Sequence, residues 1–220
     1  MKRRSLILGV SALGAAAFAS GAFYWDQRRK QEAALKAAVT PPAEESILIR
    51  AHSPIIGPRN APVTLVEFFD PSCEACRAYH PYLKALHSEF PTQFRVVMRY
   101  TPFHKGSDEA VRILETARMQ GKFEAVLDAL LAQQPHWAMH GAPALDVAWE
   151  VAGMAGLDLE RAKADRLHPD ITALLNQDTA DVRAAQVRFT PTFFMNGERL
   201  EVAGPRDLTD RVRVAVRQSR

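Results

Sequence analysis

A nearly unbroken apolar run, Val63–Phe69, leads into two cysteines, Cys73 and Cys76, that begin a helical pattern. The run has the length and composition of a buried strand, and Glu67 is its one charged residue. A cysteine at a helix N-terminus faces backbone N–H groups and the helix dipole, which favour its thiolate. The second cysteine lies one turn further on, close enough to form a disulfide with the first. This arrangement indicates dithiol–disulfide chemistry.

Other uses of the cysteine pair fit the sequence less well. Cys73 and Cys76 are the only cysteines of the chain, so no structural disulfide competes for them. A structural zinc site needs about four ligands, and the pair supplies two. A c-type haem site would need a histidine after the second cysteine, where the chain has Arg77. We therefore favour redox chemistry over metal binding and over two inert buried thiols, and we expect neither a metal nor a cofactor.

The positive charge of the chain is concentrated at its N-terminus. Residues 1–42 hold seven Lys and Arg against two acidic residues, so the remainder carries a net charge of −2 within the total of +3. The remainder therefore offers no general electrostatic attraction for nucleic acid, and no nucleic-acid partner is expected.

Residues 1–25 have the pattern of a targeting segment. Lys2-Arg3-Arg4 precedes an uncharged, largely apolar stretch from Ser5 to Trp25. Ala17-Phe18-Ala19 fits a cleavage site, but the stretch of 21 residues is also just long enough to span a bilayer. We expect either a signal peptide or a retained N-terminal anchor in the inner membrane, followed by a linker over residues 26–52. Either fate places the cysteines in the periplasm, outside the cytoplasm, where disulfides persist.

The rest of the chain alternates between strand and helix patterns. A helical stripe of apolar residues continues from Cys73 to Phe90, with Pro81 inside it. Near the C-terminus, Asn196-Gly197 joins two short apolar runs, which is a strong hairpin signal. The expected strands are Ile47–Ile49, Phe94–Tyr100, Thr192–Met195 and Glu198–Val202, and the further helical patterns cover about residues 107–186 and Arg206–Gln218.

The element order is β-α-β, a helical block, then β-β-α. Two segments in this order resemble the DsbA-like thiol–disulfide oxidoreductases: GPRNAPVTLVEF at Gly57–Phe68, and FTPTFFMNG at Phe189–Gly197. The resemblance implies an α/β, thioredoxin-like fold with a helical subdomain inserted between the βαβ and ββα halves. We therefore expect one such domain over residues 53–220, with the insertion at about residues 107–186.

The resemblance also implies roles for individual residues. Cys73 matches the exposed attacking cysteine and Cys76 the resolving one, so a reversible Cys73–Cys76 disulfide is expected. Pro191 matches the proline that follows a cis peptide bond and packs opposite the cysteines, and Thr190 matches the position whose backbone meets the substrate. Glu67 matches a buried acid beneath the active site. The implied partners are protein substrates with thiols or disulfides, and a membrane protein that restores the redox state.

Physical reasoning leaves some of these roles open. Glu67 is either a carboxylate paired with a surface base or a buried proton acceptor for Cys76 with a raised pKa. Glu74 should raise the pKa of Cys73 and weaken the protein as an oxidant. Asp70 is expected to cap the start of the helix. His80 lies on the same helix face as both cysteines, and is expected to stabilise a thiolate, to add a third metal ligand or to pack at a subdomain seam.

Three classes of function follow. The first is an extracytoplasmic thiol–disulfide oxidoreductase that acts through a mixed disulfide, in either the oxidising or the reducing direction, including a reductase dedicated to one client. The second is a copper- or zinc-binding module that uses the thiols as soft ligands. The third is a binding or chaperone domain. Catalysis of disulfide exchange by the purified protein separates the first class from the other two.

Overall fold

The structure is a computed structural model that describes residues 24–29, which are helical, and residues 46–219. The expected signal peptide or anchor lies almost wholly outside these ranges, as does the linker up to residue 45. Within residues 24–29 and 46–219, no helix is both long enough and apolar enough to cross a membrane. The nature of the N-terminal segment therefore stays a prediction.

A five-stranded sheet with the order β1-β3-β2-β4-β5 lies at the centre of the fold. The parallel central pair is β2 (Val63–Phe69) and β3 (Phe94–Tyr100), both at the predicted positions. The three outer strands, β1 (Ile55–Ile56), β4 (Thr192–Met195) and β5 (Glu198–Leu200), all pair antiparallel to their neighbours. The βαβ and ββα halves thus appear in the expected order.

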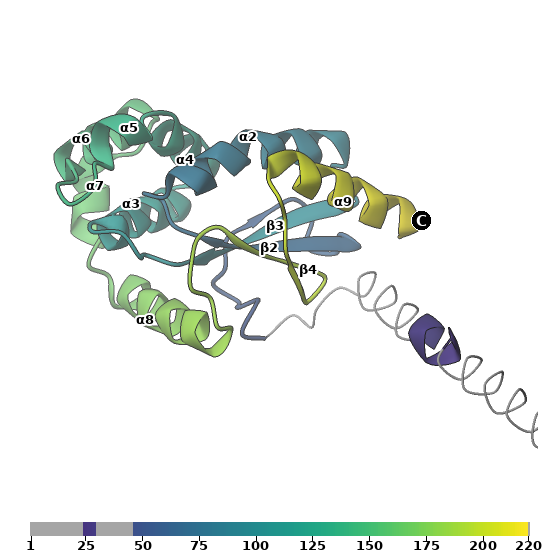
Figure 1. The fold of residues 1–220 in the computed structure, drawn as a ribbon. Helices are drawn as coiled ribbons and strands as arrows, with labels where there is room; N and C mark the ends of the chain where they lie inside the picture. The colour runs from purple at the N-terminus through teal and green to yellow at the C-terminus, as the bar shows by residue number, and fades with distance from the viewer. Residues whose placement is uncertain (1–23, 30–45, 220) are drawn as a thin grey trace, which may run out of the picture.

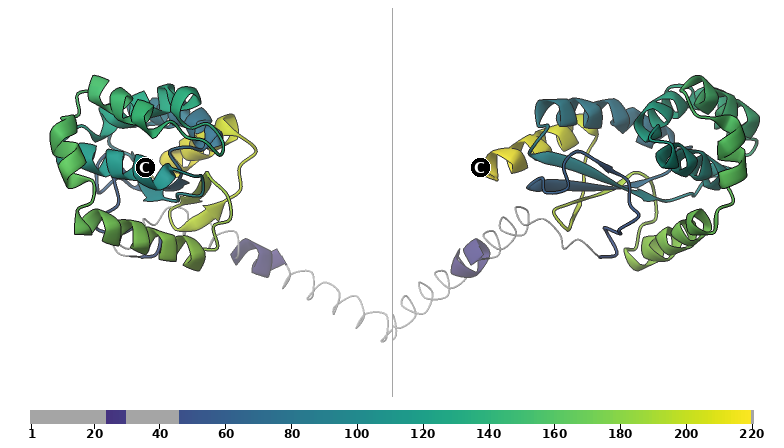
Figure 2. Two further views of the ribbon diagram at one scale, coloured as in Figure 1. Left: turned by 90° about the vertical axis from the view of Figure 1, so that its left-hand side faces the viewer. Right: turned by 180° about the vertical axis from the view of Figure 1, so that it is seen from behind.

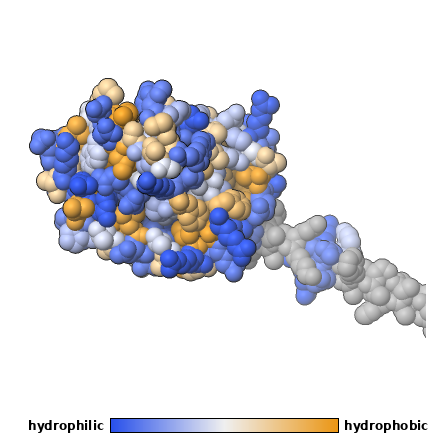
Figure 3. All heavy atoms as spheres, turned by 60° about the vertical axis from the view of Figure 1, so that its left-hand side comes forward, coloured by the Kyte–Doolittle hydropathy of each residue, from blue (hydrophilic) through white to orange (hydrophobic). Residues whose placement is uncertain are grey.

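Helices cover both faces of this sheet (Figure 1). On one face α2 (Glu74–Glu89) and α9 (Pro205–Gln218) lie side by side, and on the other lies α8 (Pro169–Ala184). The other helices between β3 and α8 gather at one end of the sheet (Figure 2). They are α3 (Ser107–Met119), α4 (Phe123–Ala132), α5 (Gln134–Trp137), α6 (Leu145–Met154) and α7 (Leu159–Asp165). On the outer face of this helical block, apolar patches lie between hydrophilic side chains (Figure 3).

Strand β2 is buried along its whole length because its alternating side chains enter two separate cores. Leu65 and Phe69 pack in the core beneath α2 and α9, whereas Val66 and Phe68 pack in the core with α8. Alternation places Glu67 on the same face as Leu65 and Phe69. The register of β2 therefore directs this carboxyl group toward the helix that carries the cysteines.

The predicted strand at Ile47–Ile49 is wrong. The segment is a tight turn in which Oγ of Ser46 accepts hydrogen bonds from the N–H groups of Leu48 and Ile49, at 3.1 and 3.2 Å. Leu48 and Ile49 are nevertheless buried in the core beneath α8, and a buried apolar turn has the composition of a strand. Residues 46–52, which we assigned to the linker, therefore contribute to the core.

The hairpin between β4 and β5 is confirmed. Asn196 and Gly197 both have positive φ, at 49° and 92°, as a two-residue hairpin turn requires. The Asn196 side-chain oxygen accepts a hydrogen bond from the Thr64 N–H at 2.8 Å, which fixes the turn to the start of β2. β4 then runs antiparallel to β2, so the chain before β4 arrives beside the end of β2 where the cysteines lie.

A buried ion network joins α8 to the centre of the sheet. The guanidinium of Arg99, on β3, is fully buried and donates to Asp178 and Asp181 on α8, both at 2.7 Å. Arg50 and His52 reach the same two carboxylates from the N-terminal segment, each at 2.7 Å. This network holds the start of the domain, the sheet and α8 together.

Candidate active site

Cys73 and Cys76 lie where β2 delivers the chain into α2. Cys73 is the N-cap residue of α2, and Cys76 lies in the first turn. Both are free thiols, so the structure represents the dithiol form. Cys73, expected to be the exposed cysteine, keeps only 6% of its surface exposed, and Cys76 keeps 1%.

The loop before β4 closes over Cys73, which accounts for part of this burial. The Thr190–Pro191 peptide bond is cis, as predicted. The Cys73 thiol donates a hydrogen bond to the Thr190 carbonyl oxygen at 3.2 Å, across 117 residues of sequence. The predicted contact between the two motifs is confirmed, and the catalytic roles assigned to them stay predictions.

The two thiols differ in acidity. The pKa of Cys73 falls from 9.0 to about 6, chiefly because the Cys76 side chain hydrogen-bonds to its thiolate. Burial opposes this shift, and a hydrogen bond from the Thr190 side chain to the thiolate adds to it. The pKa of Cys76 is raised well above 9.0, first by burial, then by the hydrogen bond of its thiol to Cys73, and then by the negative charges of Glu67 and Cys73. At neutral pH the pair therefore holds one thiolate, on Cys73, and one thiol, on Cys76.

In the reduced protein, iodoacetamide should modify Cys73 with a half-maximal rate near pH 6, since the thiolate is the reacting species. Cys76 should stay unmodified at neutral pH, because its thiol is buried and holds its proton. Peptide mass mapping across a pH series measures both sites. Equal rates at the two cysteines, or a Cys73 midpoint near pH 9, would contradict the assignment.

Glu67 lies buried beneath the cysteine pair, with 2% of its surface exposed. Burial, and then the charge of Cys73, raise the pKa of its carboxyl group from 4.5 to about 8. Its Oε1 atom has no hydrogen-bond partner among the described residues. The alternative of a carboxylate paired with a surface base is therefore wrong, and Glu67 is a carboxyl group that holds a proton near neutral pH.

Asp70 fixes the loop before α2 to the start of the helical block. Its carboxylate accepts hydrogen bonds from the N–H groups of Ser72, Phe103 and His104, at 2.9, 2.8 and 3.0 Å. It also lies 2.7 Å from the His104 ring nitrogen Nδ1. The predicted cap on α2 is wrong, because no side chain caps this helix. Asp70 instead holds the turn that precedes it.

Glu74, next to Cys73 in the sequence, is paired with a histidine of the helical block. Its carboxylate lies 2.7 Å from Nε2 of His140, on the segment between α5 and α6. The pKa of Glu74 is lowered by its own backbone N–H and then by His140. The carboxylate is thus paired, and the pKa of its neighbour Cys73 falls to about 6. The effect of the Glu74 charge on the Cys73 pKa therefore stays a prediction.

A family profile described as "Thioredoxin" matches residues 50–211. A thioredoxin-like oxidoreductase from Silicibacter pomeroyi DSS-3 superposes with a TM-score of 0.67 at 30% identity, over 80% of this chain and 99% of that one. The chain belongs to the thioredoxin family. The same fold recurs in oxidised BdbD from Bacillus subtilis, at TM-score 0.67 and 18% identity over 81% and 97% of the two chains. It also recurs in α-DsbA2 from Wolbachia pipientis, at TM-score 0.67 and 18% identity over 86% and 97%.

The chain also resembles part of larger curated proteins. It is 32% identical over 188 residues to a Na⁺/H⁺ antiporter NhaA from Herminiimonas arsenicoxydans. The aligned region is 86% of this chain but 28% of that antiporter. A second antiporter, from Salinispora arenicola, is 34% identical over 146 residues, which are 21% of its length. The chain therefore spans less than a third of the curated relatives it matches.

In this member of the thioredoxin family, the helical block supports the loop that carries Cys73 through a residue that the sequence analysis did not single out. The side-chain amide of Gln134, on α5, donates to the carbonyl oxygens of Pro71 and Cys73 at 2.8 and 3.0 Å. Trp137, close to Gln134 in the same short helix, is fully buried, and its indole N–H donates to the Leu130 carbonyl at 2.8 Å. A lone glutamine in a helical pattern carries no local signal of such a contact.

His80 packs at the seam between α2 and α4, which is the last of its three expected roles. Its Nε2 atom lies 2.7 Å from the Asp128 carboxylate on α4. Across residues 24–29 and 46–219, no three His, Cys, Asp or Glu side chains are grouped so that they could hold a metal ion. Nothing in the described residues therefore favours the metal-binding alternative.

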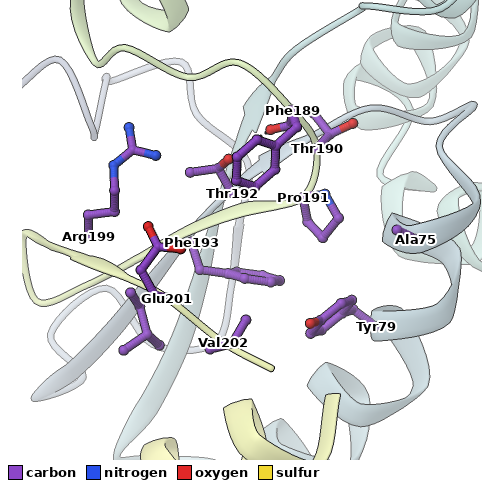
Figure 4. A pocket seen from close by; sticks show the side chains of 11 residues that line it. Ala75, Tyr79, Phe189, Thr190, Pro191, Thr192, Phe193, Arg199, Glu201 and Val202 are labelled. Carbon is purple, nitrogen blue, oxygen red and sulfur yellow. Dashed lines mark hydrogen bonds between the residues drawn. The ribbon is translucent and has the colours of Figure 1, made fainter. Parts of the chain in front are cut away.

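A hollow of about 250 Å³ opens beside the cysteines (Figure 4). Ala75 and Tyr79 of α2 line one side, and Thr190 and Pro191 line another. Phe193 lies at its base, where its ring centroid is 5.0 Å from that of Tyr79. A chain segment placed here would meet the backbone at Thr190 and lie next to the first turn of α2.

Proposed function

We propose that this oxidoreductase exchanges disulfides with protein substrates outside the cytoplasm, through the Cys73–Cys76 pair and a mixed-disulfide intermediate. The observation that carries the proposal is the opposite acidity of two adjacent thiols, with pKa values of about 6 for Cys73 and well above 9.0 for Cys76. A low-pKa thiolate is both a ready nucleophile and a good leaving group, and a buried high-pKa thiol is a resolving group kept in reserve.

In the oxidising direction, a substrate thiolate attacks Sγ of Cys73 and the Cys73–Cys76 bond breaks. Cys76 leaves as a thiolate and takes up a proton, and the substrate is now linked to Cys73. A second substrate thiolate then attacks the substrate sulfur of this mixed disulfide, and Cys73 leaves as a thiolate. The substrate loses two electrons as its disulfide forms, and the enzyme gains them as its dithiol.

Glu67 is the proposed source of the proton for Cys76. The carboxyl group is buried on the side of β2 that faces α2, and once ionised its charge raises the pKa of the Cys76 thiol. A pKa of about 8 lets it hold a proton at neutral pH and release it to a nearby thiolate of higher pKa. Reduction of a substrate disulfide uses the same transfer in reverse.

Substrates are proposed to be polypeptides with exposed apolar segments. Three large apolar side chains stand exposed on the loops that flank Cys73: Phe103 at 49%, Met139 at 52% and Phe189 at 58%. The hollow beside Thr190 and Pro191 would hold an extended chain whose backbone pairs with that of Thr190. Apolar contacts and backbone pairing are both tolerant of sequence, which suits unfolded proteins.

The extracytoplasmic location rests on the N-terminal segment, Lys2-Arg3-Arg4 followed by an apolar stretch. In that compartment a membrane redox protein would restore the disulfide or the dithiol after each turnover. A pKa of about 6 for Cys73 lies between about 7 for thioredoxin and about 3.5 for DsbA. We therefore place the couple between a dedicated reductant and a strong oxidant.

A turnover assay tests the proposed function. A catalytic amount of the oxidised protein, with glutathione disulfide as the final oxidant, should form disulfides in many equivalents of reduced, unfolded ribonuclease. The Cys73→Ser variant should form none above background. The Glu67→Gln variant should keep both thiols but turn over roughly 10-fold more slowly, because it cannot pass a proton to Cys76. A wild-type rate equal to that of the Cys73→Ser variant would refute the function.

A further inference from the structure

Two histidines from separate parts of the helical block stand beside the first turn of α2. His104 lies between β3 and α3, and His140 lies between α5 and α6. Their rings meet edge to face, with centroids 5.7 Å apart. Each is held by an acidic residue adjacent to the cysteines: His104 Nδ1 lies 2.7 Å from Asp70, and His140 Nε2 lies 2.7 Å from Glu74.

His104 is held by Asp70 through both its ring and its backbone. Asp70 is fully buried, and its carboxylate can only accept hydrogen bonds, so the ring nitrogen Nδ1 of His104 must carry a hydrogen. The backbone N–H of His104 bonds to the same carboxylate at 3.0 Å. The carbonyl of Asp70 in turn accepts from the Cys73 N–H at 3.0 Å. One residue thus ties the imidazole and the attacking cysteine to the same point.

We propose that His104, fixed by Asp70, is a positioning residue that supplies positive charge beside Cys73 and so favours the Cys73 thiolate as the leaving group in disulfide exchange. The proposal rests on the proposed function and deepens it. Neither residue between the cysteines, Glu74 or Ala75, carries a positive charge. The positive charge comes instead from the start of the inserted helical block.

The charges around His104 support this role. Asp70 contacts it from the loop before α2 and His140 from the segment between α5 and α6, and the charges of Cys73 and Glu74 at the start of α2 also act on it. Its own neighbour Lys105 turns instead to the Gly141 carbonyl at 3.1 Å. Three acidic groups therefore surround the imidazole.

These groups change the protonation of His104. Burial lowers its pKa, but the hydrogen bond and charge of Asp70, followed by the charges of Cys73 and Glu74, outweigh burial and raise it above 6.5. Coupling between two titrating groups is reciprocal, so a thiolate that favours the imidazolium is favoured by it to the same degree. The effect is present while His104 is protonated and is lost as the pH rises through its raised pKa.

The test compares three variants as purified, folded proteins. His104→Asn keeps a donor near the position of Nδ1 for Asp70 but removes the charge. His104→Lys restores a positive charge without the ring. His80→Asn is the matched control, because His80 also pairs with an aspartate, Asp128, but at the seam with α4. For each, the pKa of Cys73 is measured from the pH dependence of its alkylation, and the reduction potential is measured against glutathione.

In the His104→Asn variant the pKa of Cys73 should rise by about half a pH unit, as expected for a partly exposed charge pair. Alkylation at pH 5.5 should then slow about threefold, and the couple should become less oxidising. His104→Lys should restore most of the lost rate, and His80→Asn should match the wild type. A Cys73 pKa and potential unchanged in both His104→Asn and a second neutral variant, His104→Gln, would overturn the proposal.

This readout separates two failures. The pKa of Cys73 is measured on the reduced protein and needs no substrate, so it reports on His104 whether or not the protein turns over. Loss of turnover in the wild type would refute the proposed function, whereas an unshifted pKa in an active His104→Asn variant would refute the role of His104 alone.

Discussion

Replacing Cys76 with Ser should trap the protein on its substrates. Without the second thiol, Cys73 still attacks or is attacked, but the mixed disulfide cannot be resolved from the enzyme side. Covalent complexes should accumulate in cells that express the Cys76→Ser variant and should appear as extra bands that disappear on reduction. In this variant the release of substrate from Cys73 by a second thiol of the enzyme should slow by orders of magnitude, since the chain has no other cysteine.

Two variants control this experiment. Cys73→Ser, which keeps the buried Cys76, should trap nothing, because the pKa of that thiol is raised well above 9.0 and little of it is exposed. The double variant should also trap nothing. Equal yields of trapped complex in Cys73→Ser and Cys76→Ser would contradict the assignment of Cys73 as the attacking cysteine and Cys76 as the resolving one.

Replacing Asp178 with Ala should be the most damaging single change to stability outside the active site. The Asp178 carboxylate is fully buried and binds Arg99 at 2.7 Å, His52 at 2.7 Å and the Tyr100 N–H at 2.9 Å. Its removal leaves the buried Arg99 guanidinium with one carboxylate fewer and the Tyr100 N–H without its acceptor. The expected loss in the free energy of unfolding is about 3–5 kcal/mol, measured by urea denaturation.

The matched control is an ion pair on the surface. Glu89→Ala removes the carboxylate that Arg213 contacts at 2.8 Å across the exposed seam between α2 and α9. Exposed pairs are screened by water and salt, so this variant should unfold at nearly the wild-type urea concentration. Similar urea midpoints for Asp178→Ala and Glu89→Ala would show that the buried network contributes no more than a surface pair.

Much of the scaffold could be predicted because its signals are local. The apolar run of β2, the cysteines at the start of α2 and the Asn196-Gly197 turn each depend on a few adjacent residues. β5 ends at Leu200, two residues before the predicted Val202, because the apolar pattern does not mark where pairing stops. The strand predicted at Ile47–Ile49 was wrong because a turn that is buried in the core is as apolar as a strand.

The positions of active-site residues could be predicted only where a local pattern or a family motif includes them. Strand alternation directs Glu67 toward α2, and the family motif placed Pro191 opposite Cys73. His104 could have been found, because it follows β3, whose end lies beside the end of the parallel strand β2. Gln134 and His140 could not, since their positions depend on how the helical block packs against α2. The pairing of Glu74 with His140 could not be predicted either, because the two residues lie 66 positions apart in the sequence.

Redox titration of the purified protein against glutathione tests the central claim most directly, that Cys73 and Cys76 form one reversible redox couple. Intact mass after acid quenching should show a single two-electron transition, with both thiols lost together as an intramolecular disulfide. The Cys73→Ser and Cys76→Ser variants should lack this transition. Two thiols that persist under oxidising glutathione, or that acquire glutathione separately without forming the internal disulfide, would contradict it.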